Sequence, residues 1–341
     1  MERIRYVFTS LTRISPLPNT EFEVTPLSRQ HWQTGDYVVA EVNEPYRGTL
    51  RIEHTDGRMA EVAEGDQLVG ALGERYATME ATGTWKVVSK NNHMEVLTGA
   101  GLFGKATSRS MFLSPLIPIR YVGHVLQNGK KATMQGFVPE VDFQKFSTPT
   151  ILMVGTSMSA GKTTAARIIT RELKKTGQRI LGAKLTGAGR YRDMLSVMDA
   201  GADAILDFVD VGLPSTVCPE ETYTPALEKL LSMMAHQPAD VAVVEIGASP
   251  LEPYNGDVAI EAIRDCIKCT VLCASDPYAV YGVMKAFDLK PDIVSGVATN
   301  TKAGITLIEK LCEVKAFNLL DYDTTPQLKQ ILKEKLRPAF A

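Results

Sequence analysis

The sequence lacks several features that would assign it to a common class. No apolar run approaches the ~20 residues that a membrane-spanning helix needs, and polar residues interrupt the apolar ones in the N-terminal segment, so it does not resemble a signal peptide. The net charge is only −2, and no basic cluster exceeds two adjacent lysines. Such a charge balance argues against nucleic-acid and anionic-lipid partners. We therefore expect a cytoplasmic protein that binds neither membrane nor nucleic acid.

Cysteine and histidine are also scarce. The five cysteines all lie in the C-terminal half, and an odd set of this kind is a poor disulfide framework. The spacing of Cys266, Cys269 and Cys273 allows a metal site, but no His or second Cys-x-x-Cys pair lies nearby in the sequence. We expect buried free thiols instead. The five scattered histidines and the lack of a G-x-S-x-G segment indicate neither a zinc site nor a hydrolase triad.

The two parts of the chain have different residue patterns. A length of 341 residues favours two domains. Up to residue 146, short alternating segments are separated by turn signals such as Asp56-Gly57 and Asn128-Gly129, which predicts a compact β-rich domain, barrel-like or a sandwich. From residue 147, near-continuous apolar segments alternate with helical ones, which predicts a doubly wound parallel sheet. The predicted fold class is α/β, with domains at 1–146 and 147–341.

Within the second predicted domain, each apolar segment is expected to be a buried strand. The expected strands are 150–155, 179–185, 241–247, 269–275 and 293–300. The expected helices are 162–176, closed by Gly177, and 193–200, 224–235, 278–287 and 305–312.

The clearest motif is the glycine-rich segment GTSMSAGKTT at residues 155–164, between an apolar strand and a helix. Small residues let several backbone N–H groups point at one anion, and the helix N-terminus adds partial positive charge. Five residues separate Gly155 from Gly161, one more than in the common pattern. We predict an ATP- or GTP-binding loop in which Lys162 contacts the terminal phosphates and Thr163 ligates Mg²⁺. A chance GKT in an ordinary turn is the alternative.

The residues expected to contact the nucleotide phosphates are those of the loop and of the first turn of the helix. They are Gly155, Thr156, Ser159, Ala160, Gly161, Lys162, Thr163 and Thr164.

This loop resembles that of dethiobiotin synthetase and its relatives, the cobyric acid synthase and MinD-like branch of P-loop proteins. Two further segments agree in order: GAKLTGAG at 182–189 resembles the family's lysine-bearing loop, and VVEIGAS at 243–249 resembles its Walker B segment. The resemblance covers roughly the last 195 residues. Segments 203–212 and 245–256 are also similar to a little-characterised family with a C-terminal P-loop domain, of which one member is described as a D-glutamate N-acetyltransferase.

The resemblance implies roles for residues outside the loop. Glu245, at the end of an apolar strand, would hold Mg²⁺ with a hard oxygen ligand, and Lys184 would offset charge on the transferring phosphate. For a further metal ligand we select Asp203, with Asp193 and Asp207 as alternatives that the sequence does not separate. Asp203 and Asp207 would share a face if their segment were helical.

Other residues have weaker indications. The resemblance implies that Asn300 contacts the nucleotide base, which an Asn side chain can do by donating and accepting at once. Arg190 and Arg192 could pair with a carboxylate or phosphate. Each of these residues also has an ordinary structural reading, as a turn-forming Asn, an exposed loop arginine, a surface glutamate or a lysine whose ammonium extends to solvent.

Together these features predict a Mg²⁺- and ATP-dependent enzyme that activates a small metabolite at a carboxylate or amine by phosphoryl transfer, as a ligase or small-molecule kinase. Lys162, Lys184 and Glu245 are the predicted catalytic residues. One alternative is an N-acyltransferase of the D-amino-acid type that grips acetyl-CoA. Another is a regulatory ATPase, although the loop lacks the additional lysine of MinD-like switches. The expected partner is a small-molecule substrate, and a homodimer is possible by analogy.

Overall fold

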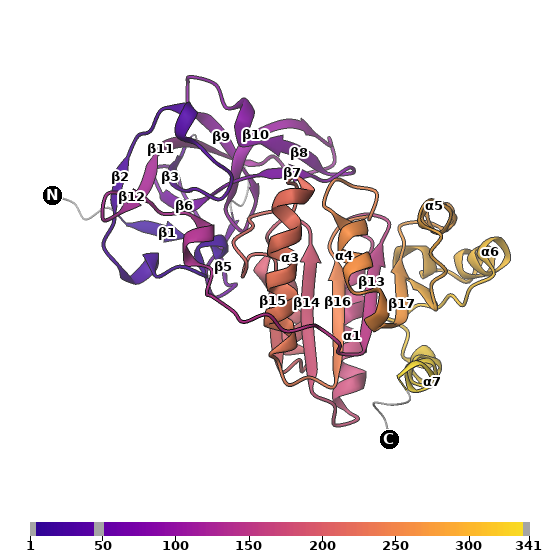
Figure 1. The fold of residues 1–341 in the computed structure, drawn as a ribbon. Helices are drawn as coiled ribbons and strands as arrows, with labels where there is room; N and C mark the ends of the chain where they lie inside the picture. Colours follow the sequence, from indigo (N-terminus) through magenta and orange to yellow (C-terminus); the bar gives the residue numbers. More distant parts are fainter. Residues whose placement is uncertain (1–4, 44–50, 337–341) are drawn as a thin grey trace. The chain divides into compact units, whose positions relative to one another are not determined.

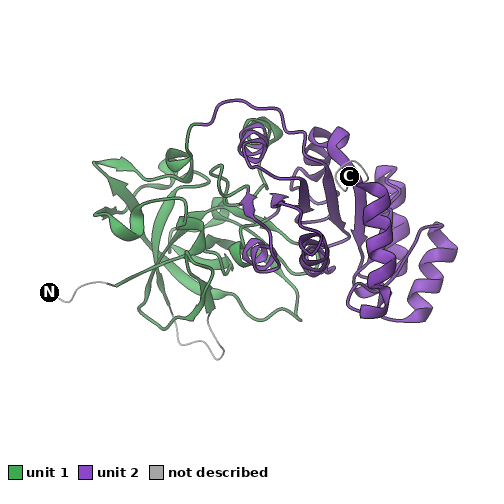
Figure 2. Cartoon of the chain, turned by 90° about the horizontal axis from the view of Figure 1, so that it is seen from below, with its two compact units in different colours: residues 1–140, 188–192, 208–226 green, residues 141–187, 193–207, 227–341 purple. Residues whose placement is uncertain are grey.

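The structure, a computed structural model, describes residues 5–43 and 51–336. The chain divides into two compact units (Figure 2). Unit 1 comprises residues 1–140, 188–192 and 208–226, and unit 2 comprises residues 141–187, 193–207 and 227–341. The chain therefore first leaves unit 1 after residue 140, a few residues before the predicted boundary at 146–147. Two segments of the predicted second domain, 188–192 and 208–226, are grouped with unit 1.

Unit 1 consists of short strands, as its alternating sequence predicts. The strands are β1 (Tyr6–Phe8), β2 (Glu23–Thr25), β3 (Tyr37–Val42), β4 (Arg51–Glu53), β5 (Met59–Glu61), β6 (Gln67–Leu72), β7 (Glu74–Tyr76), β8 (Ala81–Thr84), β9 (His93–Thr98), β10 (Leu102–Arg109), β11 (Ile117–Gln127) and β12 (Lys130–Lys131). Short 3₁₀ helices lie at Ser10–Thr12, Leu17–Asn19, Arg29–His31, Trp85–Val87 and Met134–Phe137.

The main sheet of unit 1 forms a closed series of strand pairings. β3 pairs antiparallel with β6 and β11, β9 pairs with β11 and β10, and β10 returns to pair in parallel with β6. Gly70 allows this last approach, because a Cβ there would lie 2.4 Å from the carbonyl oxygen of Gly101. Val38, Leu68 and Phe103 are fully buried in the core of this unit. The β-rich prediction is confirmed, and the barrel remains a prediction.

Unit 2 contains a six-stranded parallel sheet in the order β15-β14-β16-β13-β17-β18 (Figure 1). Its strands are β13 (Thr150–Gly155), β14 (Ile180–Thr186), β15 (Ala204–Asp207), β16 (Val241–Ile246), β17 (Ile267–Cys273) and β18 (Ile293–Ser295). Every residue of β13 is buried, so both faces of this central strand are covered, as its continuous apolar run predicts.

Helices connect the strands of this sheet. They are α1 (Lys162–Lys174), α2 (Tyr191–Asp199), α3 (Glu220–Ala235), α4 (Gly256–Ala262), α5 (Pro277–Phe287), α6 (Lys302–Cys312) and α7 (Thr325–Lys335), with 3₁₀ helices at Arg264–Cys266, Val297–Thr299 and Tyr322–Thr324. The division between units falls inside α2 and α3. Within the described ranges, none of these helices combines the length and the apolar character of a membrane span.

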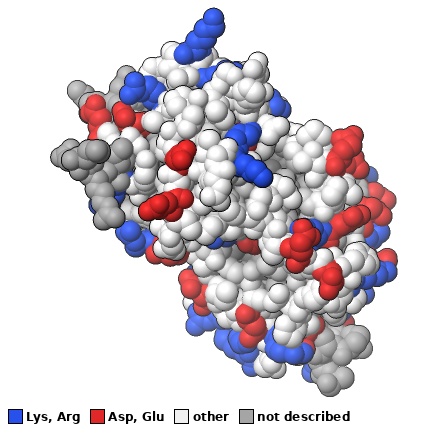
Figure 3. Space-filling model, turned by 60° about the vertical axis from the view of Figure 1, so that its left-hand side comes forward, with Lys and Arg blue, Asp and Glu red and all other residues white. Residues whose placement is uncertain are grey.

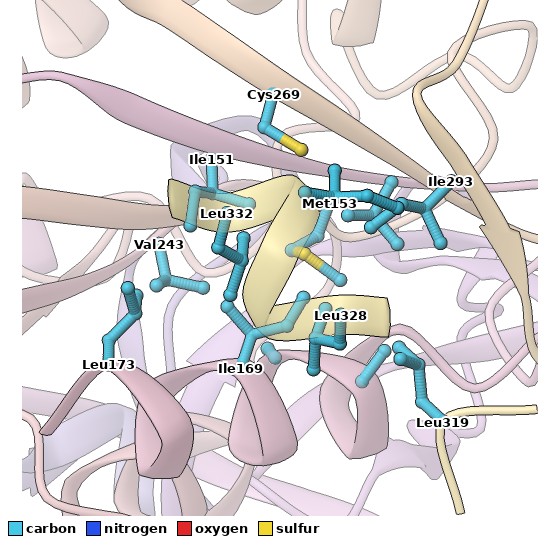
Figure 4. Packing of buried hydrophobic residues seen from close by; sticks show 14 of the residues in the cluster. Ile151, Met153, Ile169, Leu173, Val243, Cys269, Ile293, Leu319, Leu328 and Leu332 are labelled. Carbon is cyan, nitrogen blue, oxygen red and sulfur yellow. The ribbon is translucent and has the colours of Figure 1, made fainter. Parts of the chain in front are cut away.

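Two helices cover the apolar side chains of the central strand. Ile169 and Leu173 of α1 and Leu328 of α7 pack with Ile151 and Met153 of β13 (Figure 4). These side chains are almost completely buried, and each such aliphatic side chain contributes about 1.5–3 kcal/mol to folding. The packing holds α1 against β13, and residues 156–161 connect the two.

Two expected elements differ from the structure. The strand expected at 293–300 ends at Ser295, because Gly296 has φ +90° and a 3₁₀ turn follows. The segment that would have placed Asp203 and Asp207 on one helical face is instead the strand β15. The reason is its position beside β14, with which it pairs in parallel.

Candidate functional site

The segment 155–164, called here the phosphate loop, joins the end of β13 to the start of α1. Gly161 has φ +100°, which L residues rarely adopt, and a Cβ there would lie 3.3 Å from Cα of Gly296. The backbone N–H of Thr156 donates to the carbonyl of Cys273 at 3.1 Å, which ties the loop to β17. The first turn of α1 leaves its N–H groups without intrahelical acceptors. This geometry is that of an anion-binding loop.

Lys162 is buried within this loop, with 1% of its surface exposed. Its Nζ donates to the carbonyl of Ser157 at 2.7 Å. A Cβ at Gly155 would lie 2.8 Å from Nζ, so a larger residue there would displace the lysine side chain from its path across the end of β13. Burial lowers the pKa of Lys162, and Glu245 partly offsets that effect. The ammonium is held inside the loop by a neutral carbonyl, which an anion can replace.

Glu245 lies at the end of β16, the strand between β13 and β14. It is in register with Met153 on one side and with Lys184 on the other. The hydroxyl of Thr163 donates to Oε2 of Glu245 at 3.1 Å, and Nζ of Lys184 lies 3.8 Å from Oε1. The structure therefore brings Thr163, Lys184 and Glu245 together at the carboxyl edge of the sheet. A hydroxyl and a carboxylate are hard oxygen donors of the kind that fit Mg²⁺.

Lys184 is surrounded by carboxylates. Its Nζ donates to Oδ2 of Asp193 at 2.7 Å, and Asp207, which is 2% exposed, is in register with it on β15. Burial by itself would lower the pKa of Lys184, but Asp193, Glu245 and Asp207 outweigh burial and raise that pKa. Lys184 is therefore a charged ammonium in a buried position.

Asp203, selected from the sequence as a metal ligand, lies elsewhere. It precedes β15, and its carboxylate accepts hydrogen bonds from Nζ of Lys174 at 2.6 Å and from the N–H of Ile180 at 2.7 Å. Both partners belong to the amino edge of the sheet, about 13 Å from the carboxyl edge at the rise of a strand. The structure thus places Asp203 apart from Thr163, Lys184 and Glu245. The alternatives Asp193 and Asp207 are the aspartates that lie beside Lys184.

Asn300 lines a pocket next to the phosphate loop. The pocket has a volume of about 180 Å³. Its lining includes Gly161 and Thr164 on the loop side, Asn300 after β18, and Asn318 with Leu320 from the segment after α6. Asn318 and Leu320 were not anticipated, because no sequence signal indicates that this segment reaches the loop.

Of the remaining residues that the sequence singled out, some are buried and others are exposed. Ala160 is fully buried, and the side chains of Arg190 and Arg192 are exposed. Cys269 and Cys273 are fully buried in the core, where burial raises the pKa of each thiol to about 12. Over residues 5–43 and 51–336, no three His, Cys, Asp or Glu side chains are grouped so that they could hold a metal ion.

Charged side chains of both signs are intermixed on the face drawn in Figure 3. Blue and red side chains alternate there with wide neutral areas, so this face carries no continuous basic region.

Comparison of the sequence with protein-family models and with curated proteins gives no match. Among solved structures, the chain is similar to chloroplast FtsY from Physcomitrella patens, with 13% identity and a TM-score of 0.37 over 52% of this chain and 59% of that chain. It is similar to HypB from Helicobacter pylori in complex with nickel, with 14% identity and a TM-score of 0.36 over 57% and 89%. It is similar to a DUF1611 family protein from Anabaena variabilis, with 15% identity and a TM-score of 0.36 over 57% and 61%.

The chain spans less than two thirds of the length of the FtsY and Anabaena structures. All three TM-scores are below 0.5, so these similarities carry no argument about the fold. The evidence for a phosphate-binding loop is the loop geometry described above. In unit 2, a buried strand, a glycine-rich loop with an enclosed lysine and a following helix have the arrangement of a P-loop.

Proposed function

We propose that the chain is a Mg²⁺- and ATP-dependent enzyme that activates a small metabolite by phosphoryl transfer, as a ligase or small-molecule kinase. The observation that carries this proposal is the convergence of Lys162, Thr163, Lys184 and Glu245 at the carboxyl edge of one sheet. Ligands of parallel sheets bind outside this edge. The resemblance to dethiobiotin synthetase and its relatives supports the ligase or kinase class.

Thr163 and Glu245 would hold the metal ion. Asp193 replaces Asp203 as the further carboxylate that we propose, because it contacts Lys184, which in turn lies beside Glu245. When bound, Mg²⁺ neutralises charge on the phosphates of the nucleotide. The residues of the chain would hold that metal ion and the phosphate tail in one orientation.

The two lysines would have different tasks. Lys162 would exchange its hydrogen bond to the carbonyl of Ser157 for hydrogen bonds to the terminal phosphates. The buried ammonium, whose pKa burial lowers, would thereby gain a negatively charged partner. Lys184, whose charge the surrounding carboxylates maintain, would stabilise negative charge on the transferring group. The acceptor oxygen or nitrogen would bond to the γ-phosphorus while the bond to the bridging oxygen breaks and ADP leaves. A carboxylate acceptor has no proton to lose in this step, and an amine acceptor would release its proton to solvent.

The lining of the pocket beside the phosphate loop supports adenine over guanine as the proposed base. Two amide side chains, Asn300 and Asn318, line it, and none of its lining residues is acidic. An amide can accept from the amino group of adenine and donate to a ring nitrogen, whereas guanine presents two neighbouring donors that suit a carboxylate. This supports ATP as the nucleotide.

Calorimetric titration with ATP, GTP and acetyl-CoA, each with and without Mg²⁺, tests the proposal. We expect ATP to bind more tightly than GTP by at least about tenfold, with Mg²⁺ strengthening the binding. Incubation with ATP and pools of small carboxylic and amino acids, followed by mass spectrometry, should then give ADP and a modified metabolite. Binding of acetyl-CoA without binding of ATP would instead support the N-acyltransferase, and ATP turnover only with a protein partner would support the regulatory ATPase.

A further inference from the structure

Thr156, the residue that follows β13 in the phosphate loop, lies beside the end of β17. Its backbone N–H donates to the carbonyl of Cys273 at 3.1 Å. This bond continues the parallel pairing of the two strands, in which Gly155 is in register with Cys273. With its N–H group, Thr156 therefore still takes part in the ladder of β13 and β17, although it lies outside the strand.

The other half of this pairing is made by the side chain of Thr156. In a regular parallel ladder, a residue whose N–H donates to one carbonyl of the neighbouring strand accepts with its own carbonyl from the N–H two residues further along. For Thr156, that N–H belongs to Ser275. The N–H of Ser275 donates instead to Oγ1 of Thr156, at 3.0 Å. The hydroxyl thus takes the place of the carbonyl in the ladder.

A side-chain acceptor at this position changes the course of the chain. Hydroxyl side chains give backbone groups an alternative to the bonds of a sheet, so the N–H of Ser275 is satisfied while the backbone after Thr156 turns away from β17. The turn follows directly, because the carbonyl of Ser157 accepts from the N–H of Ala160 at 3.4 Å and from Nζ of Lys162 at 2.7 Å. The first bend of the phosphate loop is therefore located where the hydroxyl ends the ladder.

The proton of this hydroxyl also has an acceptor. Oγ of Ser275 lies 3.3 Å from Oγ1 of Thr156 and donates to Oδ2 of Asp276 at 3.2 Å. Since the proton of Ser275 goes to the carboxylate, the hydroxyl of Thr156 is the donor to Oγ of Ser275. Oδ1 of Asp276 accepts from the N–H groups of Tyr278 and Ala279 and so caps α5. The start of the loop is thus joined to the capped end of a helix.

The far end of the loop is held by close packing. A Cβ at Gly296 would lie 2.2 Å from the carbonyl oxygen of Ala160, and a Cβ at Gly161 would lie 3.3 Å from Cα of Gly296. These contacts and those of Thr156 all lie within unit 2. The loop is therefore fixed at both ends, and the segment between them is the part that curves around an anion.

We propose that Thr156 is a positioning residue, whose hydroxyl ends the pairing of β13 with β17 and so sets the curvature of the phosphate loop. The common phosphate-loop pattern places its first glycine where this chain has Thr156. Glycine has no hydroxyl to offer to Ser275. The proposal rests on the proposed function, because the curvature is measured through the binding of phosphates. In this role Thr156 acts through the loop backbone and does not have to touch the nucleotide.

The test compares variants that separate the contacts of Thr156. Thr156→Val keeps the shape of the side chain and loses the oxygen, whereas Thr156→Ser keeps the oxygen. Ser275→Ala loses the hydroxyl contact and keeps the N–H. Thr150→Val is the matched control, because it removes a threonine hydrogen bond, to the carbonyl of Thr148 at 2.9 Å, at the opposite end of β13.

Calorimetric titration with ATP and with tripolyphosphate, each with Mg²⁺, is the first measurement. Thr156→Val should weaken the binding of both ligands about tenfold, because the N–H of Ser275 then competes for the carbonyl of Thr156 and straightens the loop. Thr156→Ser should stay within about threefold of the wild type, and Ser275→Ala and Thr150→Val within about twofold. Tripolyphosphate has neither base nor ribose, so an equal loss for both ligands locates the effect at the phosphate tail.

Hydrogen–deuterium exchange is the second measurement. Exchange of residues 156–163 should accelerate about fivefold in Thr156→Val and stay unchanged in Thr150→Val. If Thr156 contributes to stability alone, both variants will lower the melting temperature, while the loop exchange and the affinity for the two ligands remain those of the wild type. That result overturns the proposal.

The two proposals fail in different ways. If the wild type binds neither ATP nor tripolyphosphate, the proposed function is wrong, and the exchange of residues 156–163 still decides whether Thr156 shapes the loop. If the wild type binds both ligands and Thr156→Val binds them equally well, the positioning role alone is wrong. Thr156→Ala, which also lacks the oxygen, replaces Thr156→Val in both measurements should the latter fail to fold.

Discussion

The two edges of the parallel sheet in unit 2 both carry ion pairs, but the pairs differ in how far they are exposed to solvent. At the amino edge, Lys174 pairs with Asp203 at 2.6 Å and Arg179 pairs with Asp240 at 2.7 Å, and the side chains of these pairs are 34–57% exposed. At the carboxyl edge, the side chains of Lys184 and Glu245 are only 6% and 7% exposed. One sheet thus has solvated ion pairs at one end and a buried charge cluster at the other.

The difference matters because the two kinds of pair have different energetics. An exposed ion pair contributes about 0–1 kcal/mol to stability. A buried pair gains attraction but loses hydration, so a well-packed apolar replacement is often as stable or more so. The charges at the carboxyl edge are therefore poorly explained by stability alone, which agrees with the function proposed for that edge. The following variants test the contrast.

Replacing the central cation of the carboxyl edge should have the largest effect. Lys184→Met leaves Asp193, Glu245 and Asp207 without their shared counter-charge, and removal of one partner from a buried pair costs about 3–5 kcal/mol. Urea denaturation at pH 7 should show this loss in the free energy of unfolding. Combining it with Glu245→Gln should recover part of the loss, and a change below about 1 kcal/mol for Lys184→Met would show that the cluster is hydrated.

Lys162→Ala should mainly affect ligand binding. The variant loses the ammonium enclosed by the phosphate loop, and loss of charge-assisted hydrogen bonds to a phosphate should weaken ATP binding about 100-fold. Lys174→Ala, at the far end of the same helix, serves as the control and should change affinity less than about twofold. Unchanged ATP binding by Lys162→Ala in calorimetry would remove the basis for the site.

The pH dependence of stability should report the burial of Lys162. Because burial lowers the pKa of Lys162 below the ordinary value of 10.5, the unfolded chain binds more protons between the two pKa values. The destabilising contribution of this group is full below the folded pKa and is relieved as pH rises toward the unfolded value. Lys162→Met should therefore be more stable than the wild type at neutral pH, with an advantage that shrinks as pH increases. A constant advantage in urea denaturation across that range would contradict the buried position.

The smallest effect is expected at the amino edge. Asp203→Asn removes one exposed ion pair but keeps an acceptor for the N–H of Ile180, so it should change the free energy of unfolding by less than about 1 kcal/mol. Mg²⁺-dependent ATP binding should stay within about twofold of the wild type. A tenfold loss in this titration would return Asp203 to the metal site, whereas Asp193→Asn is expected to show such a loss.

The sequence predicted much of unit 2 because its signals are local. The strand expected at 150–155 and the helix start at Lys162 agree with β13 and α1. The apolar run is bounded by small residues, and the apolar positions of the helix, such as Ile169 and Leu173, recur at helical spacing and are buried. Local patterns of this kind are sufficient to predict where the loop lies and which lysine it contains.

The remaining features depend on contacts between distant segments. β15 has only four residues, too few for periodicity to separate strand from helix. The choice among Asp193, Asp203 and Asp207 depends on the register of β15 with β14, which the spacing of aspartates does not contain. The return of β10 to β6 joins residues far apart in the sequence, and no local pattern records it.

The rate at which the thiol of Cys273 is modified should report how often the strand that anchors the phosphate loop opens. It lies at the end of β17, fully buried, and the carbonyl of the same residue holds Thr156. Burial raises the pKa of this thiol to about 12, so alkylating reagents meet neither an accessible nor an ionised sulfur. Modification of Cys273 requires β17 to separate from β13, so a ligand bound in the phosphate loop should slow the modification.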